Sequence, residues 1–235
     1  MSAEDINEHA VRVGILEDHY TTVDGYTYRL SRYPNIKLVA TARNGEQLTK
    51  LLQEHEIDVL ILDVVAPAAE GSTAPYPLFN VLPNLRKQYP QMGVLVISGH
   101  RHPTLIRSVM EAGARGYIVK TDAAASRRLG EIITSIASGG MYLSEQTVES
   151  LAQKNGSADD IDMLTDRQRE VLSMCAANPG MPTDELAGNL NIAPSTVRNL
   201  LSSSYKRLRV NNMTAAILKA CELGLITPLD DLYEL

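Results

Sequence analysis

Apolar residues in the first part of the chain occur in short, nearly continuous runs rich in β-branched residues, separated by segments with helical periodicity. Such runs are typical of strands in a parallel sheet covered on both faces. The five predicted strands are residues 11–16, 36–40, 58–63, 94–98 and 117–119. Helices are predicted between them, at residues 44–52 (capped by Asn44 with Gln47), 104–112 and 123–138. We therefore predict an α/β domain over residues 10–138, with a doubly wound, five-stranded parallel sheet.

The pattern changes after Gly139 and Gly140, where the last of these helices stops. A short helix at residues 144–153 leads into a polar stretch, and we interpret residues 139–160 as a linker. No strand pattern follows. Residues 161–227 instead predict a small all-α domain of four helices. Its signals are a capping box at Thr165 and Gln168, a cap at Thr183, a first-turn proline at Pro194 and a periodic run at 213–223.

Five polar side chains stand at or just after the carboxyl ends of the predicted strands. They are Glu17, Asp18, Asp63, Ser98 and Lys120. Ligands of an open parallel sheet bind at this edge, so these side chains should converge. Three carboxylates repel one another at close range unless a hard cation such as Mg²⁺ lies among them. An aspartate that lies beside Mg²⁺ and a lysine can attack a phosphoryl group. Each of these residues alone could be a polar strand-end residue without a chemical role, but the presence of all five favours phosphoryl transfer.

The charge of the chain is unevenly distributed. The formal net charge is −6, yet residues 186–221 contain no Asp or Glu and five Lys or Arg. One face of the third predicted helix gathers polar and cationic residues, and we expect it to contact DNA phosphates and base edges, although a solvated helical face is the alternative. The candidate DNA-binding residues are Ser195, Thr196, Arg198, Asn199, Ser202, Lys206 and Arg209.

Composition gives the expected compartment. The only cysteines are Cys175 and Cys221, too few for a disulfide framework, which favours a reducing cytoplasm. No apolar run reaches the ~18 residues that a membrane span needs. Residues 1–9 contain no Lys or Arg, so we expect neither a signal peptide nor a transit peptide.

Further residues accompany the strand-end set, namely His19, Pro67 and the run from Ala112 to Lys120. With them, residues 10–138 resemble the receiver domain of two-component response regulators. The resemblance implies that a histidine kinase phosphorylates Asp63. It also implies that Mg²⁺ is held by Glu17, Asp18, Asp63 and the backbone carbonyl of Val65. Lys120 would contact the phosphoryl group, while Ser98 and Tyr117 would reorient as a switch.

The second domain carries a matching series of short motifs, at residues 164–172, 185–187, 190–192, 195–198 and 206–208. They resemble the LuxR-type helix-turn-helix domain, so the whole chain resembles a NarL/FixJ-type response regulator. This implies a scaffold helix at 183–190, a recognition helix at 194–209 and a dimerisation helix at 213–223. The implied partners are promoter sites in double-stranded DNA, a histidine kinase, a second copy of the chain and RNA polymerase, with no membrane.

The chain departs from the family pattern at several positions. Ala66 precedes Pro67 where methionine is usual, and Leu200 and Met213 replace a common histidine and arginine. Asp63 and Ser98 are 35 residues apart, several more than usual, which places a long loop at residues 68–77. We expect this loop to be exposed and mobile. His100 and His102 stand two apart, but without a third ligand we expect exposed loop histidines rather than a metal pair.

Two alternatives remain open. The first is a transcription factor that no longer uses phosphate and is controlled by a partner bound to the receiver through the long loop. The second is a phosphatase with an aspartate nucleophile, for which Val65 stands where a second acid is commonly needed. The favoured interpretation is not an enzyme: its catalysis is confined to its own phosphoryl transfer and loss.

Overall fold

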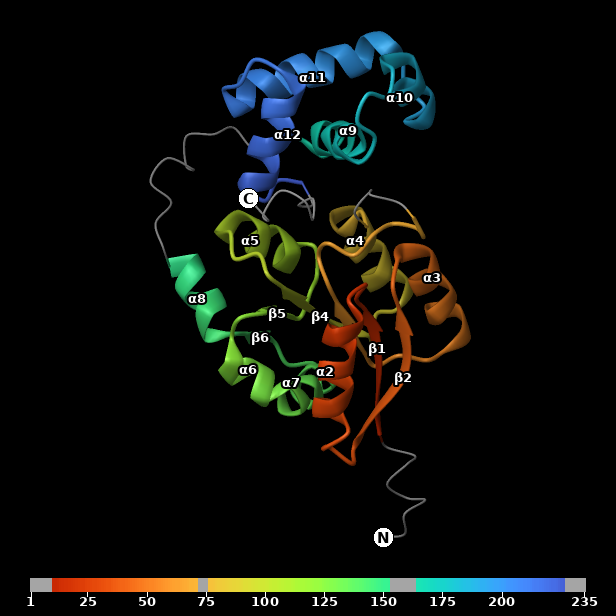
Figure 1. Cartoon of the computed structure of the whole chain (residues 1–235), viewed down its shortest axis with the longest axis vertical. Coiled ribbons are helices and arrows are strands. Elements are labelled where there is room, and N and C mark those ends of the chain that lie inside the picture. Colours follow the sequence, from red (N-terminus) through yellow and green to blue (C-terminus); the bar gives the residue numbers. More distant parts are fainter. Residues whose placement is uncertain (1–9, 72–75, 153–163, 227–235) are drawn as a thin grey trace.

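The computed structural model describes residues 10–71, 76–152 and 164–226, which form an α/β domain and a helical domain (Figure 1). The strands are β1 (Val11–Leu16), β2 (Ile36–Ala42), β3 (Val59–Leu62), β4 (Gly93–Ser98), β5 (Gly116–Val119) and β6 (Tyr142–Leu143). The helices of the α/β domain are α2 (Tyr20–Leu30), α3 (Gly45–Glu54), α4 (Leu78–Gln88), α5 (Pro103–Glu111), α6 (Ala123–Arg127), α7 (Leu129–Ala137) and α8 (Glu145–Ala152).

The strands form one parallel sheet in the order β2-β1-β3-β4-β5-β6. The doubly wound parallel sheet is thus confirmed, with one strand more than the five predicted. The backbone N–H of Tyr142 donates to the carbonyl of Arg115 at 2.9 Å, and that of Ser144 donates to Tyr117 at 3.1 Å. This sixth strand lies in the segment interpreted as a linker, because two residues are too few to produce an apolar run.

Successive residues of the central strands face opposite sides of the sheet. Leu60 and Leu62 of β3 pack in one cluster with α3, α4 and α5, whereas Val59 and Ile61 pack in another with α2, α6 and α7. Both faces are therefore buried, which explains the continuous apolar runs. The helix predicted at 123–138 is divided into α6 and α7 at Arg128, whose φ of −100° and ψ of 16° are not helical.

The helical domain consists of α9 (Asp166–Ala177), α10 (Thr183–Asn189), α11 (Pro194–Leu208) and α12 (Met213–Glu222). The capping box is confirmed, since Thr165 and Gln168 each accept a hydrogen bond from the other's backbone N–H. Pro194 is in the first turn of α11, as predicted. The predicted cap at Thr183 is wrong by one position: the N-cap is Pro182, Thr183 is the first helical residue, and no side-chain capping bond forms.

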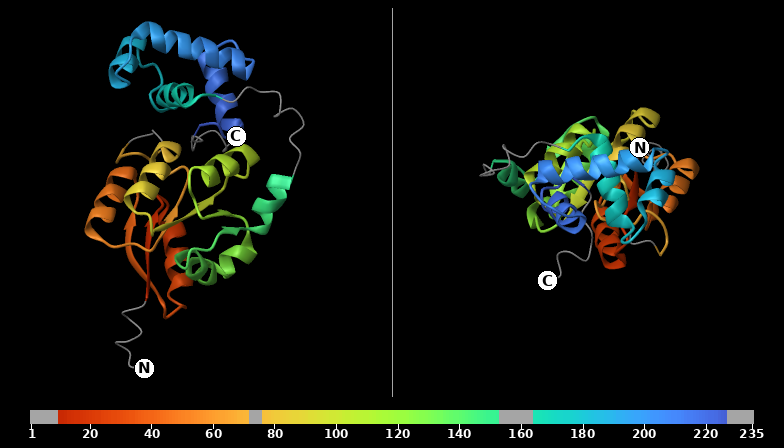
Figure 2. Two further views of the ribbon diagram at one scale, coloured as in Figure 1. Left: turned by 180° about the vertical axis from the view of Figure 1, so that it is seen from behind. Right: turned by 90° about the horizontal axis from the view of Figure 1, so that it is seen from above.

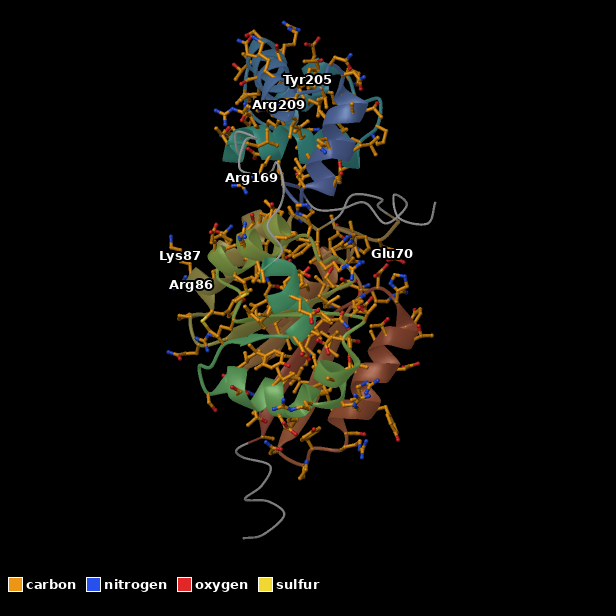
Figure 3. The ribbon with its side chains drawn as sticks, turned by 90° about the vertical axis from the view of Figure 1, so that its left-hand side faces the viewer. Glu70, Arg86, Lys87, Arg169, Tyr205 and Arg209 are labelled. Atoms are coloured by element: carbon orange, nitrogen blue, oxygen red, sulfur yellow. The ribbon has the colours of Figure 1, made fainter. Side chains whose placement is uncertain are left out.

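The two domains meet at the end of α12. Gly224 has a φ of +65°, and a Cβ atom there would lie 2.5 Å from the Cβ of Leu105 in α5, so only glycine fits this close approach. The guanidinium of Arg169 lies 5.9 Å from the ring centroid of Phe79 in α4. Figure 3 shows Arg169 on the side of the helical domain that faces the sheet. The longest helix, α11, lies on the opposite side (Figures 1 and 2).

Within the described residues, every helix is too short or too polar to cross a lipid bilayer.

Candidate functional site

The strand register brings the predicted strand-end residues to one edge of the sheet. Leu16 pairs with Leu62, and Ser98 pairs with Val119. The backbone N–H of Asp63 donates to Leu16 at 2.9 Å, and that of Lys120 donates to Ser98 at 2.8 Å. The residues that follow β1, β3 and β5 are therefore neighbours, although they are far apart in the sequence.

Lys120 connects two of the carboxylates. Its Nζ donates to Oε2 of Glu17 and to Oδ2 of Asp63, each at 2.8 Å. Both acidic side chains are only 1% exposed. Burial raises the pKa of the Glu17 carboxyl, and the charge of Asp63 raises it further. Burial opposes the charge on Lys120, but Asp63 and Glu17 outweigh it and raise the pKa of the ammonium.

One oxygen of this cluster lacks a hydrogen bond. Oδ1 of Asp63 is buried and has no partner among the described residues. A buried acceptor without a partner carries a desolvation penalty that an incoming donor or cation would relieve. Lys120 already occupies Oδ2 of Asp63, so Oδ1 is the oxygen of this carboxylate that could accept an incoming group.

A group of metal-ligand atoms follows β1 at the same edge of the sheet. Ligand atoms of Glu17, Asp18 and His19 lie within 4.8 Å of one another; Asp63 is not in this group but is joined to Glu17 through Lys120. Nδ1 of His19 lies 3.2 Å from Oε1 of Glu17 and 3.0 Å from Oδ1 of Asp18. Sequence reasoning assigns His19 no role of its own, because a residue three positions past a strand has no fixed direction. These oxygen donors fit a hard cation such as Mg²⁺.

Ser98 and Tyr117 form the next part of the site. Ser98 is fully buried, and its Oγ accepts the backbone N–H of His100 at 3.2 Å. The hydroxyl of Tyr117 donates to the carbonyl of His100 at 2.6 Å. Burial raises the pKa of the Tyr117 phenol, so it remains a neutral donor. Both predicted switch residues thus hold the loop between β4 and α5.

The two histidines of this loop differ from expectation, since both are partly buried rather than exposed. Nδ1 of His102 accepts the backbone N–H of Thr104 and caps α5. Burial lowers the pKa of both imidazoles, and the charges of Glu222 and Lys219 from α12 act on His102. Neither histidine belongs to a metal-ligand group within the described residues.

The long loop after Asp63 is packed at its ends. The backbone N–H of Tyr76 donates to Ala66 at 2.7 Å, and the N–H of Gly45 donates to Pro67 at 3.0 Å. Tyr76 is 9% exposed, and its ring lies where a Cβ of Gly45 would be, so the expectation of a wholly exposed loop is wrong for this residue. Glu70 and Gly71 are exposed as expected, and residues 72–75 lie outside the described residues.

The predicted DNA-binding residues all reach solvent. Ser195, Thr196, Arg198, Asn199, Ser202, Lys206 and Arg209 are exposed. Val197 and Leu208, on the opposite side of α11, are buried. Arg209 does not continue the helix, because it is the C-cap with a left-handed φ of 56°. The cationic face of α11 therefore ends at Lys206, and Arg209 lies just after the helix.

Comparison with known proteins identifies both domains. Residues 13–131 match the model of the response regulator receiver domain, and residues 162–220 match the LuxR family of bacterial regulatory proteins. The transcriptional regulatory protein DegU of Brevibacillus brevis is 26% identical over 241 residues, covering 94% of this chain and 97% of DegU. A probable transcriptional regulatory protein NarL of Mycobacterium tuberculosis is 27% identical over 218 residues, covering 92% and 96%.

The fold has solved counterparts. RcsB from Salmonella enterica serovar Typhimurium, bound to the promoter rprA in the presence of phosphomimetic BeF₃⁻, superposes with a TM-score of 0.65 at 19% identity. The superposition covers 89% of this chain and 98% of that one. At this identity the likeness concerns the fold alone.

Proposed function

The chain belongs to the two-component response regulators that join a receiver domain to a LuxR-type DNA-binding domain, and from this premise we propose that Asp63 is its phosphoacceptor. The observation that carries the proposal is the position of Lys120 between Glu17 and Asp63, with Oδ1 of Asp63 buried and without a partner. A histidine kinase is the donor that the family implies. The carboxylate attacks phosphorus, the bond to the donor breaks, and an aspartyl phosphate forms.

The surrounding residues prepare this transfer. Glu17, Asp18 and Asp63, with the backbone carbonyl of Val65 in the turn after Asp63, would hold Mg²⁺. The bound ion would neutralise negative charge on the transferred oxygens. Lys120 supplies a second positive charge at a fixed place, because two buried carboxylates already orient its ammonium. When a phosphoryl group arrives, the Lys120 Nζ can move its donors from the carboxylates to the phosphoryl oxygens.

The geometry also supports a route from Asp63 to the helical domain. If the Ser98 hydroxyl rotates toward the phosphoryl group, it no longer accepts the hydrogen bond from the backbone N–H of His100. Tyr117 holds the carbonyl of that same residue. Two residues further on, His102 caps α5, and Leu105 of α5 contacts Gly224 at the end of α12. A change at Ser98 therefore reaches the domain contact through one short loop.

The helical domain supports sequence-dependent DNA binding as a dimer. The face of α11 that carries Arg198, Asn199 and Lys206 is exposed, and α11 lies on the side of the helical domain farther from the sheet (Figure 1). Leu218 on α12 is 45% exposed, which suits the dimerisation role implied for this helix. RNA polymerase remains a partner proposed from the family, and the cytoplasm is the proposed compartment.

Phosphorylation with acetyl phosphate and Mg²⁺, read by intact mass spectrometry, tests the assignment. We expect one phosphoryl group on the wild-type protein and none on Asp63→Asn. Asp24→Asn, which removes an exposed carboxylate from α2, is the matched control and should label like wild type. Undiminished labelling of Asp63→Asn would overturn the site. An unlabelled wild-type protein that still binds DNA would favour the phosphate-independent transcription factor.

A further inference from the structure

A second concave site lies away from the phosphoryl site. It is a cleft of about 350 Å³ between the end of α2 and the end of α6, lined by Arg29, Arg32, Tyr33 and Arg127. The helices that form it cover the face of the sheet opposite to α5, whose Leu105 contacts the helical domain. Arg32 and Tyr33 lie just before β2, at the amino ends of the strands, whereas Asp63 lies at their carboxyl ends. The cleft is therefore separate from both sites described above.

The walls of the cleft are held by the fold. Nη1 of Arg29 donates to the carbonyl of Ser126 at 3.5 Å, which links α2 to α6. The N–H of Tyr33 donates to Leu30 at 2.9 Å, and the N–H of Ile36 donates to Tyr33 at 3.0 Å. The Tyr33 ring lies against Gly130 of α7, where a Cβ would be 2.3 Å from the ring. The cleft is thus built from three segments with fixed backbones.

The charge in the cleft is uncompensated. No carboxylate is among its lining residues, and none of the three arginines forms an ion pair within the described part of the chain. The neighbouring Arg128 shows the contrast, since its Nε pairs with Glu131 at 2.8 Å. In a chain of net charge −6, three guanidinium groups around one hollow concentrate positive charge at a single place.

We propose that this cleft binds a compact small molecule that carries two or more phosphate groups. Guanidinium groups recognise phosphate through paired, charge-assisted hydrogen bonds, and each of the three arginines offers several donors. A volume of about 350 Å³ is at the lower end of small-molecule sites, whereas protein partners bury broad surfaces of about 800 Å² a side. Tyr33 adds a half-buried ring and a hydroxyl to the wall, which suits an organic group attached to the phosphates.

Calorimetric titration of the full-length protein with pyrophosphate, without Mg²⁺ and at low ionic strength, tests the proposal. We expect saturable 1:1 binding that weakens with added salt. Arg32→Gln and Arg127→Gln should each weaken it by about tenfold, because each removes one charge-assisted contact. Arg128→Gln is the matched control, because that guanidinium is adjacent in sequence but paired with Glu131, and it should change the affinity less than about twofold. Inorganic phosphate should bind more weakly than pyrophosphate.

Other outcomes would overturn the proposal. Equal losses in Arg127→Gln and Arg128→Gln would show diffuse surface attraction, and loss of binding in Lys206→Gln would place the anion on α11. Equal affinity for citrate would show a general polyanion site without phosphate preference. Asp63→Asn should retain full pyrophosphate binding, so failure of this proposal and failure of the phosphoacceptor assignment are distinguishable. Unchanged thermal unfolding of each arginine variant without ligand keeps the comparison valid.

Discussion

Replacing Lys120 with methionine tests the charge balance of the phosphoryl site. Its ammonium contacts both Glu17 and Asp63, and both carboxylates are 1% exposed. Removing one partner of a buried ion pair costs roughly 3–5 kcal/mol, because the remaining charge is left without compensation. We expect Lys120→Met to lower the free energy of unfolding at pH 7, without Mg²⁺, by about 3 kcal/mol. The loss of stability should lie at the lower end of this range, because burial already raises the pKa of Glu17 and its protonation removes one of the two uncompensated charges.

Asp63→Asn, unlike Lys120→Met, should not lower the free energy of unfolding. The two carboxylate oxygens each lie 2.8 Å from one nitrogen, so they are at most about 5.6 Å apart (twice 2.8 Å) and repel by roughly 3 kcal/mol at an effective dielectric constant near 20. The substitution removes an attraction to Lys120 of about 6 kcal/mol at 2.8 Å and the same dielectric constant. Relief of the repulsion offsets about half of this loss, and removal of the desolvation cost of the buried Asp63 charge offsets the rest. Asp63→Asn alone should therefore leave stability unchanged or slightly higher. Added to Lys120→Met, the Asp63→Asn substitution should raise the free energy of unfolding by at least about 1 kcal/mol over that of Lys120→Met alone.

Urea unfolding followed by tyrosine fluorescence measures these changes, because eight of the ten tyrosines lie between residues 20 and 142. Lys50→Met is the matched control: its pair with Glu54 is on the surface at 3.8 Å, and its removal should change stability by about 0.5 kcal/mol or less. A Lys120→Met cost as small as that of Lys50→Met would refute the buried charge balance. So would a double variant no more stable than Lys120→Met alone.

Three further predictions concern other parts of the molecule. Asn199→Ala should reduce the preference for one DNA sequence and leave the salt dependence of binding nearly unchanged. Lys206→Gln should weaken binding to all duplexes and flatten the slope of log affinity against log salt by about 0.9 for each phosphate that is no longer neutralised. Identical salt slopes of the two variants in anisotropy titrations would contradict this division. Arg12 donates hydrogen bonds to Asp58 and lowers the pKa of that carboxyl, so the stability from this pair is present at pH 7 and is lost as the pH falls through the folded-state pKa. Arg12→Gln should therefore cost about 1 kcal/mol in chemical denaturation at pH 7, and this cost should shrink below pH ~4. A cost that does not depend on pH would contradict the linkage. Tyr76→Ala should lower the free energy of unfolding by about 3 kcal/mol because the ring is buried, and a neutral result in urea unfolding would show that the loop end is not packed.

The sequence predicts the five main strands well because a parallel sheet covered on both faces requires continuous apolar runs. It also predicts that Glu17, Asp63 and Lys120 converge, because the carboxyl ends of parallel strands share one edge of the sheet. It does not predict that Lys120 is shared by two carboxylates at equal distances, since this depends on side-chain direction. The strand β6 escapes prediction because it joins the sheet through backbone bonds and has no apolar pattern.

Two of the other errors arise from contacts between segments distant in sequence, and the third is a local shift of one residue. His102 lies in a polar loop, which predicts exposure, but it caps α5 and lies close to α12. Tyr76 belongs to a stretch with the composition of a polar loop, but its ring fills the space that Gly45 leaves open. Thr183 has the residue type of a cap, yet the chain enters α10 one residue earlier. None of these contacts produces a local periodic signal.

The proposal on which the biological role depends is that phosphorylation of Asp63 controls DNA binding by α11, and one titration tests it. A fluorescent duplex selected by the protein from a random pool is titrated with wild type and Asp63→Asn, before and after treatment with acetyl phosphate and Mg²⁺. We predict that the treatment changes the affinity of wild type by about tenfold or more, a coupling of about 1.4 kcal/mol, and leaves Asp63→Asn unchanged. Equal affinity of treated and untreated wild type, with labelling of Asp63 verified by mass, would show that the phosphoryl group does not control DNA binding.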